Sequence, residues 1–331
     1  MKEQKKLSEL ITGESVNHYL LVNKIEIRTT KTKKEYLSFE FSDSSRSVNA
    51  NMWDNIGNLI DLIQQGKVVL VIGTMSEYQG TPQIKLSNVR PVNENDNVTP
   101  RDFLPKSKRD LSLMQKEFKD RINKITNPFL KKLTTSIFNK ENFDQLSIAP
   151  AGKSWHHAYI GGLIEHTLEI IKTCDLMCDF HSELNRDLLI CGAMLHDFGK
   201  TTELEYDSAF EYTNKGKLIG HIVIMAMLID NEAKKINNFP EELKNHLIHL
   251  VLSHQGKLEF ASPVIPKTME AIALYQADEL SAKVNAYKNA IKQGIKEGSN
   301  WTRFIHLANT DLTKTDIPDN AEEETKNTLF D

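Results

Sequence analysis

Residues 192–200 read GAMLHDFGK, and this stretch decides how the C-terminal part of the chain folds. The adjacent pair His196-Asp197 follows an apolar run with helical spacing, and Gly199 after it is expected to end the helix. A buried imidazole or carboxylate without a partner is costly, so the pair calls for a polar partner inside a helical domain.

Further stretches share this feature, because each sets a His or Asp in otherwise apolar helical sequence. They are GGLIEHTLEI (161–170), GKLIGHI (216–222), LSHQG (252–256) and YQADELSAK (275–283). A metal ion is the simplest partner that satisfies imidazoles and carboxylates together. We therefore expect a metal centre assembled from separate helices.

Asp197 is expected to bridge two divalent ions. Neighbouring residues on a helix diverge by about 100°, so His196 and Asp197 can face different ions. A carboxylate has two oxygens, whereas a neutral imidazole has one free nitrogen and cannot bridge. The expected ligands are His166, His196 and Asp278 for one ion and His221 and His254 for the other. Lys200 would then present a cation to an anionic substrate.

Beyond residue 107 the pattern is almost wholly helical. Apolar spacing predicts helices over 108–125, 128–138, 155–180, 184–197, 216–236, 240–253 and 267–292. His156 and His157 would lie at the start of the 155–180 helix, where free backbone N–H groups favour anions. Either side chain is a candidate to steady a phosphate or to protonate a leaving oxygen.

The N-terminal part of the chain has the pattern of a small β-barrel. Alternation and β-branched or aromatic residues predict strands over 16–28, 35–41, 46–53, 67–76 and 81–92, with a helix within 54–66. Three strands, a helix and two strands is the order of an OB-fold, a partly open barrel that commonly binds oligonucleotides.

This barrel carries aromatic and cationic residues that suit a single strand of nucleic acid. Phe39 and Phe41 share one parity and are expected in the core. Bases stack on exposed aromatic rings, and nearby cations add a salt-dependent attraction to phosphates. The candidates for nucleic-acid contact are Tyr36, Trp53, Tyr78, Lys33, Lys34 and Arg46.

The chain divides into a barrel domain (1–92), a linker (93–107), a helical domain (108–310) and an acidic flexible tail (311–331), which is a multi-domain α+β architecture. Residues 101–140 hold 11 basic and four acidic side chains, which suit either a phosphate-facing surface or a solvated helix face. Residues 311–331 hold two basic and seven acidic side chains, a composition typical of a mobile tail.

The overall composition excludes several classes of protein. The formal net charge of the 331 residues is −4, so the chain as a whole is not a basic nucleic-acid binder. It has neither an apolar run of about 18 residues nor a signal-peptide pattern, and we expect a cytoplasmic protein without a membrane partner. The cysteines Cys174, Cys178 and Cys191 lack zinc-type spacing and are expected as core thiols.

The ordered His and Asp residues resemble the HD-domain metal-dependent phosphohydrolases. The combination with an OB-fold resembles more closely the bacterial YhaM-type 3′-5′ exoribonucleases. The matching text is WHHAYIGGLIEHT, YTNKGKLIGH, and LSHQG followed by EFASPVIP. One departure is Gln255, which stands where the family often has a second His and offers an amide oxygen instead of an imidazole.

The resemblance implies an all-α HD domain and a metal-dependent 3′-5′ exoribonuclease that acts on single-stranded RNA, with single-stranded DNA as a second candidate substrate. It also implies two divalent ions and a homo-oligomer. The mixed His and carboxylate donors suit Mn²⁺, Fe²⁺, Co²⁺ or Zn²⁺ better than Mg²⁺, and the family favours Mn²⁺. Two alternatives are an HD nucleotide phosphohydrolase for dNTPs or cyclic dinucleotides, and a non-catalytic single-strand-binding replication accessory protein.

Overall fold

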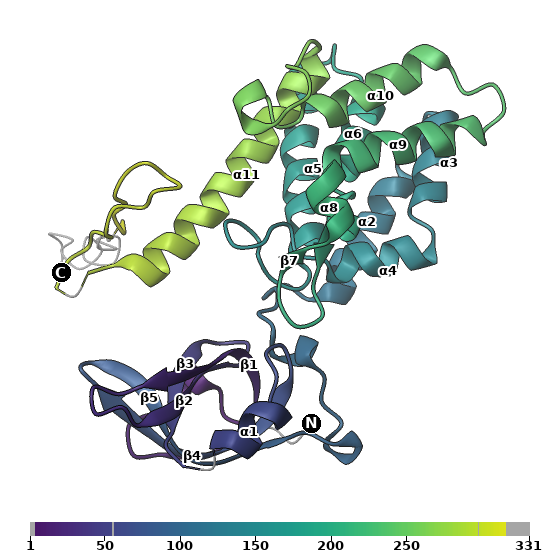
Figure 1. Ribbon diagram of the computed structural model, residues 1–331. Coiled ribbons are helices and arrows are strands. Elements are labelled where there is room, and N and C mark those ends of the chain that lie inside the picture. The colour runs from purple at the N-terminus through teal and green to yellow at the C-terminus, as the bar shows by residue number, and fades with distance from the viewer. Residues whose placement is uncertain (1–3, 55, 297, 316–331) are drawn as a thin grey trace, which may run out of the picture.

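The computed structural model describes residues 4–54, 56–296 and 298–315. Figure 1 shows a β-barrel formed by the N-terminal part of the chain and a group of packed helices above it. The long helix α11 (Met269–Gly294) runs out of this group and carries the last described residues away from it. The expected fold class, a five-stranded barrel followed by a helical domain, is confirmed for the described residues.

The barrel consists of β1 (Ser15–Thr29), β2 (Glu35–Ser42), β3 (Ser47–Met52), β4 (Val68–Tyr78) and β5 (Thr81–Pro91). The strands close in the order β1-β2-β3-β5-β4, with β3 parallel to β5 and the other neighbours antiparallel. Helix α1 (Ile56–Leu62) lies between β3 and β4 in the sequence. The expected strand bounds are correct to within two residues, and the barrel is closed rather than partly open.

Period-two alternation fills the barrel interior. Phe39 and Phe41 of β2 are at most 1% exposed, and their rings stack with centroids 5.0 Å apart, as their shared parity predicts. The neighbouring strands contribute Val16, Leu20, Val48, Val71 and Ile84 to the same core. Burying each such side chain contributes about 1.5–3 kcal/mol to the stability of the barrel. The aromatic rings that face outward are not part of this core.

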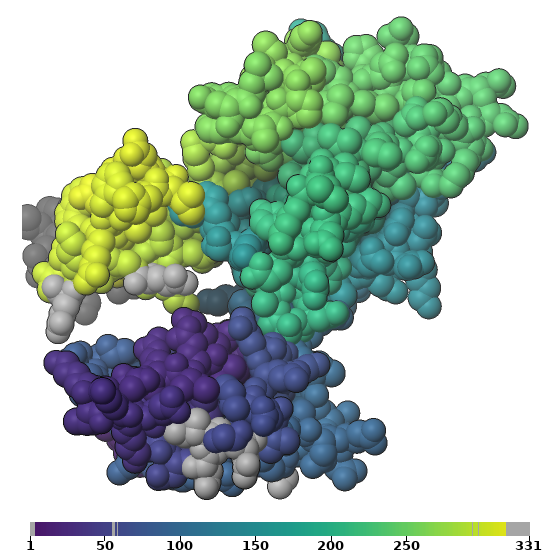
Figure 2. All heavy atoms as spheres, in the orientation of Figure 1, coloured from purple at the N-terminus to yellow at the C-terminus, as the bar shows by residue number. Residues whose placement is uncertain are grey.

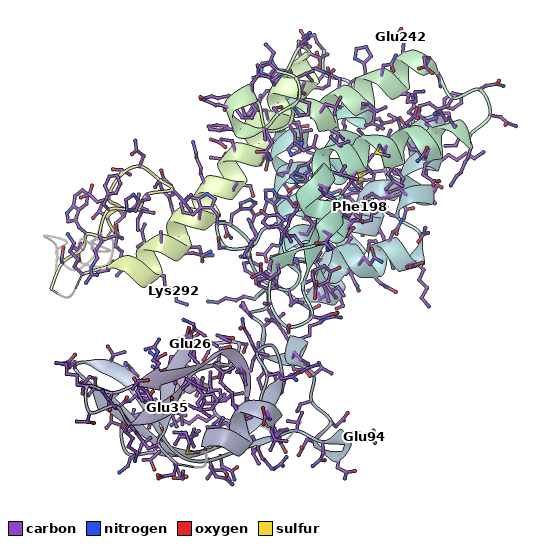
Figure 3. The ribbon with its side chains drawn as sticks, in the orientation of Figure 1. Glu26, Glu35, Glu94, Phe198, Glu242 and Lys292 are labelled. Carbon is purple, nitrogen blue, oxygen red and sulfur yellow. The ribbon has the colours of Figure 1, made fainter. Side chains whose placement is uncertain are left out.

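The helical domain contains, in chain order, α2 (Leu111–Asn123), α3 (Pro128–Ile137), α4 (Lys140–Ile148), α5 (Gly162–Phe180), α6 (Arg186–Leu195), α7 (Lys200–Glu203), a hairpin of β6 (Leu204–Glu205) and β7 (Glu211–Tyr212), α8 (Asn214–Ile219), α9 (His221–Lys234), α10 (Glu241–Ser253) and α11. Short 3-10 turns lie at Leu7–Glu9, Glu94–Asp96, Pro100–Phe103 and Leu258–Phe260. Phe198, labelled in Figure 3, is 4% exposed in the core and meets the Phe138 ring at 5.2 Å. Among the described helices, none is long and apolar enough to cross a membrane.

Several helix bounds differ from the sequence-based expectation where a glycine turns the backbone. The helix expected over 155–180 begins only at Gly162, because Gly161 has a φ of 79°. The helix expected over 216–236 is divided into α8 and α9 at Gly220, which has a φ of 76°. A left-handed φ interrupts a right-handed helix and is readily adopted by glycine. Helix α4, helix α7 and the β6–β7 hairpin were not expected.

Residues 93–107 pack between the two domains. Phe103 and Leu104 are buried in one cluster with Leu21 and Val68 from the barrel and Ile160 from the helical domain. Because these side chains come from both domains, their burial stabilises the barrel against the helical domain.

The segment after α11 is held by isolated β-bridges. Ile295 pairs with Thr302, Trp301 with Thr313, and Ile305 with Thr310. The expected tail starts at residue 311, and the described residues 311–314 belong to this bridged segment, with Leu312 7% exposed. The rest of the expected tail, 316–331, lies outside the described residues.

Candidate metal centre and nucleic-acid interface

Separate elements bring the predicted ligands to one point in the helical domain. They are His166 in α5, His196 and Asp197 directly after α6, His221 at the start of α9, His254 directly after α10, and Asp278 in α11. Except for the partly exposed His221, these residues are buried to at least nine tenths of their surface. The structure therefore brings together every residue that sequence reasoning assigned to the metal centre.

Asp197 lies at the middle of this cluster and presents one oxygen to each side. Its Oδ2 lies 3.4 Å from His196 Nε2 and 3.7 Å from His166 Nε2. Its Oδ1 lies 3.3 Å from His221 Nε2 and 3.6 Å from His254 Nε2. We call His166, His196, Asp278 and Asp197 Oδ2 the first ligand group, and His221, His254 and Asp197 Oδ1 the second.

Asp278 completes the first ligand group from α11. Its Oδ1 lies 3.0 Å from His166 Nε2 and 4.0 Å from His196 Nε2. Donor atoms of His166, His196 and Asp197 lie within 4.8 Å of one another, and so do those of Asp197, His221 and His254. This arrangement fits a carboxylate that bridges two cations, as the sequence predicts.

Asp197 faces both ligand groups, but it does not lie within a helix as the sequence analysis expected. Helix α6 ends at Leu195, so Asp197 lies in the turn that follows rather than within the helix. Gly199 does not end the helix with a left-handed φ, because its φ is −56° and it precedes α7. A Cβ on Gly199 would lie 2.2 Å from the backbone oxygen of His221, so glycine is needed here for the close approach of α9.

The second ring nitrogen of each ligand imidazole is held by an acceptor outside the cluster. His196 Nδ1 lies 2.8 Å from the Ala193 carbonyl, and His254 Nδ1 lies 2.7 Å from the Val251 carbonyl. A carbonyl only accepts, so Nδ1 carries a proton in both rings, and the neutral form of each ring has its free lone pair at Nε2.

The remaining two imidazoles follow the same pattern. His221 Nδ1 lies 2.9 Å from Glu203 Oε1. His166 Nδ1 lies 2.9 Å from Ser281 Oγ, and this hydroxyl donates its own proton to Glu169 Oε2 at 2.6 Å. Ser281 must therefore accept from His166, which leaves His166 Nε2 unprotonated.

Several buried atoms of the cluster lack a hydrogen-bond partner among the described residues. They are Nε2 of His166, His196 and His221 and Oδ1 of Asp197. Burying such atoms without a partner is costly, and a divalent cation in each ligand group would satisfy them together. The donor set therefore fits the divalent metal binding that its residue types predict.

Burial and charge set the protonation state that metal ligands need. Burial lowers the pKa of His166 and of His254, which favours the neutral ring. Burial alone would raise the pKa of Asp197, but Lys200 and His196 hold it well below its usual range. His196 differs from His166 and His254: burial would lower its pKa, but Asp197, Asp278 and the Ala193 carbonyl together outweigh burial and raise it.

Lys200 lies inside the cluster rather than at an exposed helix end. It is 8% exposed, and its Nζ lies 2.6 Å from Asp197 Oδ2. Burial would lower the pKa of Lys200, but Asp197 raises it above its usual value. The ammonium therefore stays charged beside the first ligand group.

His156 and His157 do not start a helix, which corrects the expectation. They lie in the loop before α5, and His157 has a φ of 43°. The His157 backbone N–H donates to Asn285 Oδ1 at 2.8 Å, and its Nε2 lies 3.3 Å from Glu169 Oε2. The rings of His156 and His157 lie 4.9 and 5.0 Å from that of His166, so both border the first ligand group.

Sequence reasoning missed the residues that orient the ligands. Glu203 accepts from both the backbone N–H and Nδ1 of His221, although it lies 18 residues earlier. Glu169 reaches the cluster only through Ser281 and His157. Of these, Ser281 had a sequence signal, because it follows Asp278 by three residues and shares its helix face.

Gln255 borders the second ligand group. Its side-chain amide nitrogen lies 3.0 Å from His254 Nε2, so this nitrogen covers the lone pair that would face a cation. The amide must turn away, or present its oxygen, when that lone pair binds a metal.

An aromatic patch lies on the barrel. The Tyr36 and Trp53 rings stack at 4.5 Å with a 25° angle between their planes. Together with Tyr78 they line a cleft of about 670 Å³, and Trp53 and Tyr78 are 42% and 63% exposed. Lys33 and Lys34 lie in the turn between β1 and β2.

Arg46 lies apart from this aromatic patch. It belongs to the turn between β2 and β3, where Ser42 pairs with Ser47, whereas Leu37 pairs with Met52 at the other end. The structure therefore brings together the aromatic candidates and separates Arg46 from them.

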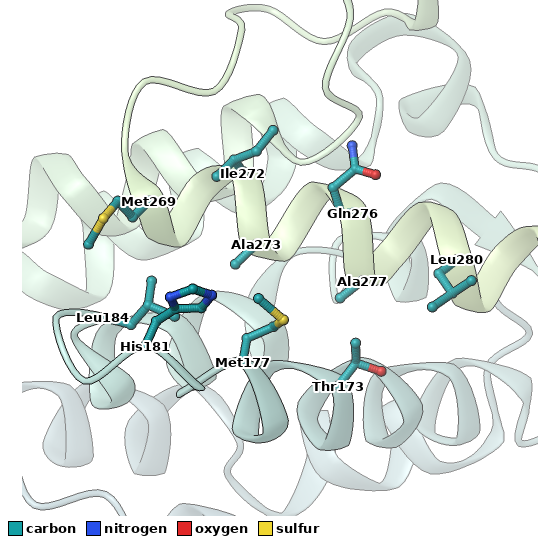
Figure 4. A pocket seen from close by; sticks show the side chains of 10 residues that line it. All are labelled: Thr173, Met177, His181, Leu184, Met269, Ile272, Ala273, Gln276, Ala277 and Leu280. Atoms are coloured by element: carbon teal, nitrogen blue, oxygen red, sulfur yellow. The ribbon is translucent and has the colours of Figure 1, made fainter. Parts of the chain in front are cut away.

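Another pocket, of about 420 Å³, lies between α5 and α11 (Figure 4). Its wall includes Met177, Ile272 and Leu280. Ala277 in this wall precedes the ligand Asp278, so the pocket and the metal centre use different faces of α11. The wall is mostly apolar, and its polar side chains are Thr173, His181 and Gln276.

Two domain models match the chain. The HD domain model matches residues 163–283, a range that contains every predicted metal ligand. The OB-fold nucleic acid binding domain model matches residues 22–92.

Similar proteins cover nearly the whole chain. The 3′-5′ exoribonuclease YhaM of Bacillus subtilis is 32% identical over 302 residues, which are 91% of this chain and 95% of that protein. The Bacillus pumilus YhaM is 34% identical over 307 residues, with the same shares of both chains. The chain belongs to the YhaM family of 3′-5′ exoribonucleases. Family membership confirms the sequence-based resemblance and places the Asp197 cluster in a YhaM-type HD domain.

Among solved structures, a domain of replication protein A from Methanococcus maripaludis aligns with 27% of this chain and 94% of that chain. The sequence identity is 21% and the TM-score is 0.24, and a score this low says nothing about function.

Proposed function

We propose that this YhaM-family chain removes nucleotides from the 3′ end of single-stranded RNA by metal-dependent hydrolysis at the Asp197 cluster. The observation that carries the proposal is the position of Asp197, whose two oxygens each face a pair of imidazole Nε2 atoms. The similarity to YhaM exoribonucleases over 91% of the chain supports the direction of cleavage and the choice of RNA.

The ligand groups would hold two divalent ions, with Mn²⁺ as the proposed metal and Fe²⁺, Co²⁺ or Zn²⁺ as alternatives. Such a pair of ions activates water and neutralises charge on a phosphodiester. Imidazole and carboxylate donors suit these metals better than Mg²⁺, which prefers oxygen ligands. The residues proposed to hold the ions are His166, His196, Asp197, His221, His254 and Asp278.

Side chains beside the ligand groups would handle the phosphate and the leaving oxygen. Lys200 is buried and stays charged, so its ammonium suits an oxygen of the scissile phosphate. Burial holds the pKa of His156 well below its usual value, so this ring is a neutral hydrogen-bond donor. His157 lies next to the Glu169 carboxylate and would pass a proton to the leaving O3′.

The barrel would hold the strand while its 3′ end is hydrolysed. Tyr36, Trp53 and Tyr78 offer ring faces for base stacking, which contributes about 1–3 kcal/mol per base. Lys33 and Lys34 near one end of this patch would attract phosphates. Arg46 is proposed to contact the strand at another place.

A direct experiment compares end-labelled single-stranded RNA, single-stranded DNA, a dNTP and a cyclic dinucleotide, each with Mn²⁺ and with a chelator. A ladder that shortens from the 3′ end of RNA only with metal supports the proposal. Turnover of the dNTP or of the cyclic dinucleotide alone would favour a nucleotide phosphohydrolase. Binding of the strands without loss of substrate in any metal would favour an accessory binding protein.

Assembly into a homo-oligomer stays an expectation from the family resemblance. Light scattering of the purified chain measures its mass in solution, and a mass of one chain would contradict the expectation.

A further inference from the structure

A second cleft, of about 670 Å³, separates the barrel from the helical domain. Its lining comes from the β2–β3 turn of the barrel, from the segment before α2, from the loop before α5 and from the β6–β7 hairpin. Residues from these segments are Arg46, Pro105, Lys153, Ser154, Ser208 and Phe210. Figure 2 shows the helical domain reaching down to the barrel at the place where these segments meet.

Arg46 brings an unsatisfied cation to this cleft. Its Nε and Nη2 atoms are buried and have no hydrogen-bond partner in the described parts of the chain. The neighbouring carboxylate of Asp43 is already occupied, because Oδ1 accepts from Ser45 and from the Arg46 backbone and Oδ2 from the Leu7 backbone. A guanidinium left without an acceptor is costly, and its planar fork matches the oxygens of a phosphate.

The loop before α5 forms a wall between this cleft and the metal centre. Lys153, Ser154 and Ala158 line the cleft. His156 and His157 from the same loop lie with their rings 4.9 and 5.0 Å from that of His166. One loop therefore lines the cleft and borders the first ligand group.

Backbone hydrogen bonds hold that loop in place. The Ile160 N–H donates to the Pro105 carbonyl at 2.8 Å, and the Ser107 N–H donates to the Ile160 carbonyl at 2.9 Å. From the other side, the His157 N–H donates to Asn285 Oδ1 at 2.8 Å. The wall is thus a defined surface rather than a loose connection.

The opposite wall is anchored to the segment between the domains without using Arg46. Asp207 in the β6–β7 hairpin pairs with Arg101, whose guanidinium lies 5.8 Å from the Tyr206 ring centre. Tyr206 and Phe210 pack against the apolar cluster between the domains. The cleft is therefore formed by contacts that leave the Arg46 guanidinium available for a ligand.

We propose that this cleft binds the sugar–phosphate backbone of a single-stranded nucleic acid on its way to the metal centre, with Arg46 holding a phosphate. The proposal rests on the proposed function and adds a second contact region to the aromatic patch. The aromatic patch and the cleft lie at opposite ends of β2. Six residues of strand separate them by about 20 Å. They would therefore contact different nucleotides.

The path of the strand is measured by photocrosslinking of the wild-type chain in chelator, where no hydrolysis occurs. The probe is a labelled single-stranded RNA with 4-thiouridine at one defined position, and mass spectrometry maps the crosslinked peptide. We expect 4-thiouridine near the 3′ end to crosslink to residues 42–47, 153–158 or 208–210. Bound RNA that crosslinks only outside these segments would overturn the proposal.

The phosphate contact is tested by comparing Arg46→Glu with Lys267→Glu, which makes the same charge change at an exposed residue before α11. Fluorescence anisotropy in chelator should show single-stranded RNA bound about tenfold more weakly by Arg46→Glu, with a salt dependence lower by about one counterion. Lys267→Glu should bind within about twofold of the wild type. Equal binding by the two variants would contradict a phosphate contact at Arg46.

Failure of this proposal can be told apart from failure of the proposed function. A 3′-shortening ladder in Mn²⁺ without crosslinks in the cleft overturns the cleft proposal and leaves the exonuclease activity in place. Crosslinks in the cleft without any ladder support the cleft as a binding site and overturn the exonuclease activity. If Arg46→Glu does not fold, the crosslinking of the wild-type chain decides alone.

Discussion

The metal centre and the barrel surface differ in how far their proposed functional side chains are buried and held by hydrogen bonds. In the metal centre, almost every polar group is buried, and each ligand ring is fixed by a hydrogen bond from Nδ1. On the barrel, Trp53, Tyr78, Lys33 and Lys34 are exposed, Tyr36 and Arg46 are partly exposed, and the Tyr36 and Trp53 rings stack on each other. Changes in the metal centre should therefore affect hydrolysis and metal affinity, whereas changes on the barrel should affect strand binding.

The largest effect is expected from Asp197→Asn. The amide cannot carry the negative charge that both ligand groups share, so hydrolysis of RNA should fall by about a thousandfold or more. Nucleotide release from end-labelled RNA measures the rate, and plasma mass spectrometry measures bound Mn²⁺. RNA binding in chelator should stay near that of the wild type, since the barrel is unchanged. Full activity of the Asp197→Asn variant would remove the bridging carboxylate from the proposal.

A smaller loss of metal affinity and activity is expected from Glu203→Gln. This substitution changes only the residue that holds the proposed metal ligand His221. The amide can donate to His221 Nδ1, which would move the ring proton to Nε2 and block the lone pair that faces Asp197. Metal affinity should fall by about 10- to 100-fold. Calorimetric titration with Mn²⁺ measures it, and excess Mn²⁺ should restore part of the activity.

The matched control is Glu205→Gln, an exposed carboxylate two residues further along in β6. It should titrate with Mn²⁺ as the wild type does. A similar loss in both variants would mean that Glu203 acts through general charge and not through His221.

Two glycine-to-alanine substitutions compare how tightly the backbone is packed in the two regions. Gly199→Ala would place a methyl group 2.2 Å from the His221 carbonyl, so α9 must shift, at a cost of about 1–3 kcal/mol in stability. Gly57→Ala in α1 has open space around the new methyl group and should leave the melting temperature unchanged or raise it slightly. Thermal unfolding by circular dichroism compares the two, and equal melting temperatures would contradict the close approach at Gly199.

The smallest effect on turnover at saturating substrate is expected from Trp53→Ala. Losing one stacking ring should weaken binding of single-stranded RNA by about tenfold, while the maximal rate of hydrolysis changes little. Anisotropy in chelator and a KM–kcat analysis in Mn²⁺ measure these quantities. Phe39→Ala in β2 is the contrast, because removing a buried ring costs about 3–5 kcal/mol and should unfold the barrel. If Trp53→Ala lowered kcat alone, the aromatic patch would not be a binding surface.

The two regions also differed in how far the sequence alone predicted them. The strand bounds followed from period-two alternation, which is strong in β2 because Leu37, Phe39 and Phe41 all face the core. The convergence of the proposed metal ligands was predicted because polar residues in apolar helices need a common partner. In both cases a local pattern was sufficient.

Features that depend on tertiary contacts or on backbone direction were not predictable. The left-handed backbone at Gly161 moved His156 and His157 out of the helix, and the break at Gly220 divided α8 from α9. Glu203 reaches His221 only because the β6–β7 hairpin returns the chain to it. Arg46 is near Lys34 in sequence but lies at the other end of β2. The two ends of this strand are far apart because a strand rises by about 3.3 Å per residue.

The outward hydrogen bonds of the ligand rings have a kinetic consequence. Because Ala193, Val251 and Glu203 hold the Nδ1 atoms of these rings, the Nε2 atoms face inward toward Asp197. Metal binding then needs no ring flip. It needs the Gln255 amide to turn away from His254 Nε2 and any proton on His196 Nε2 to leave.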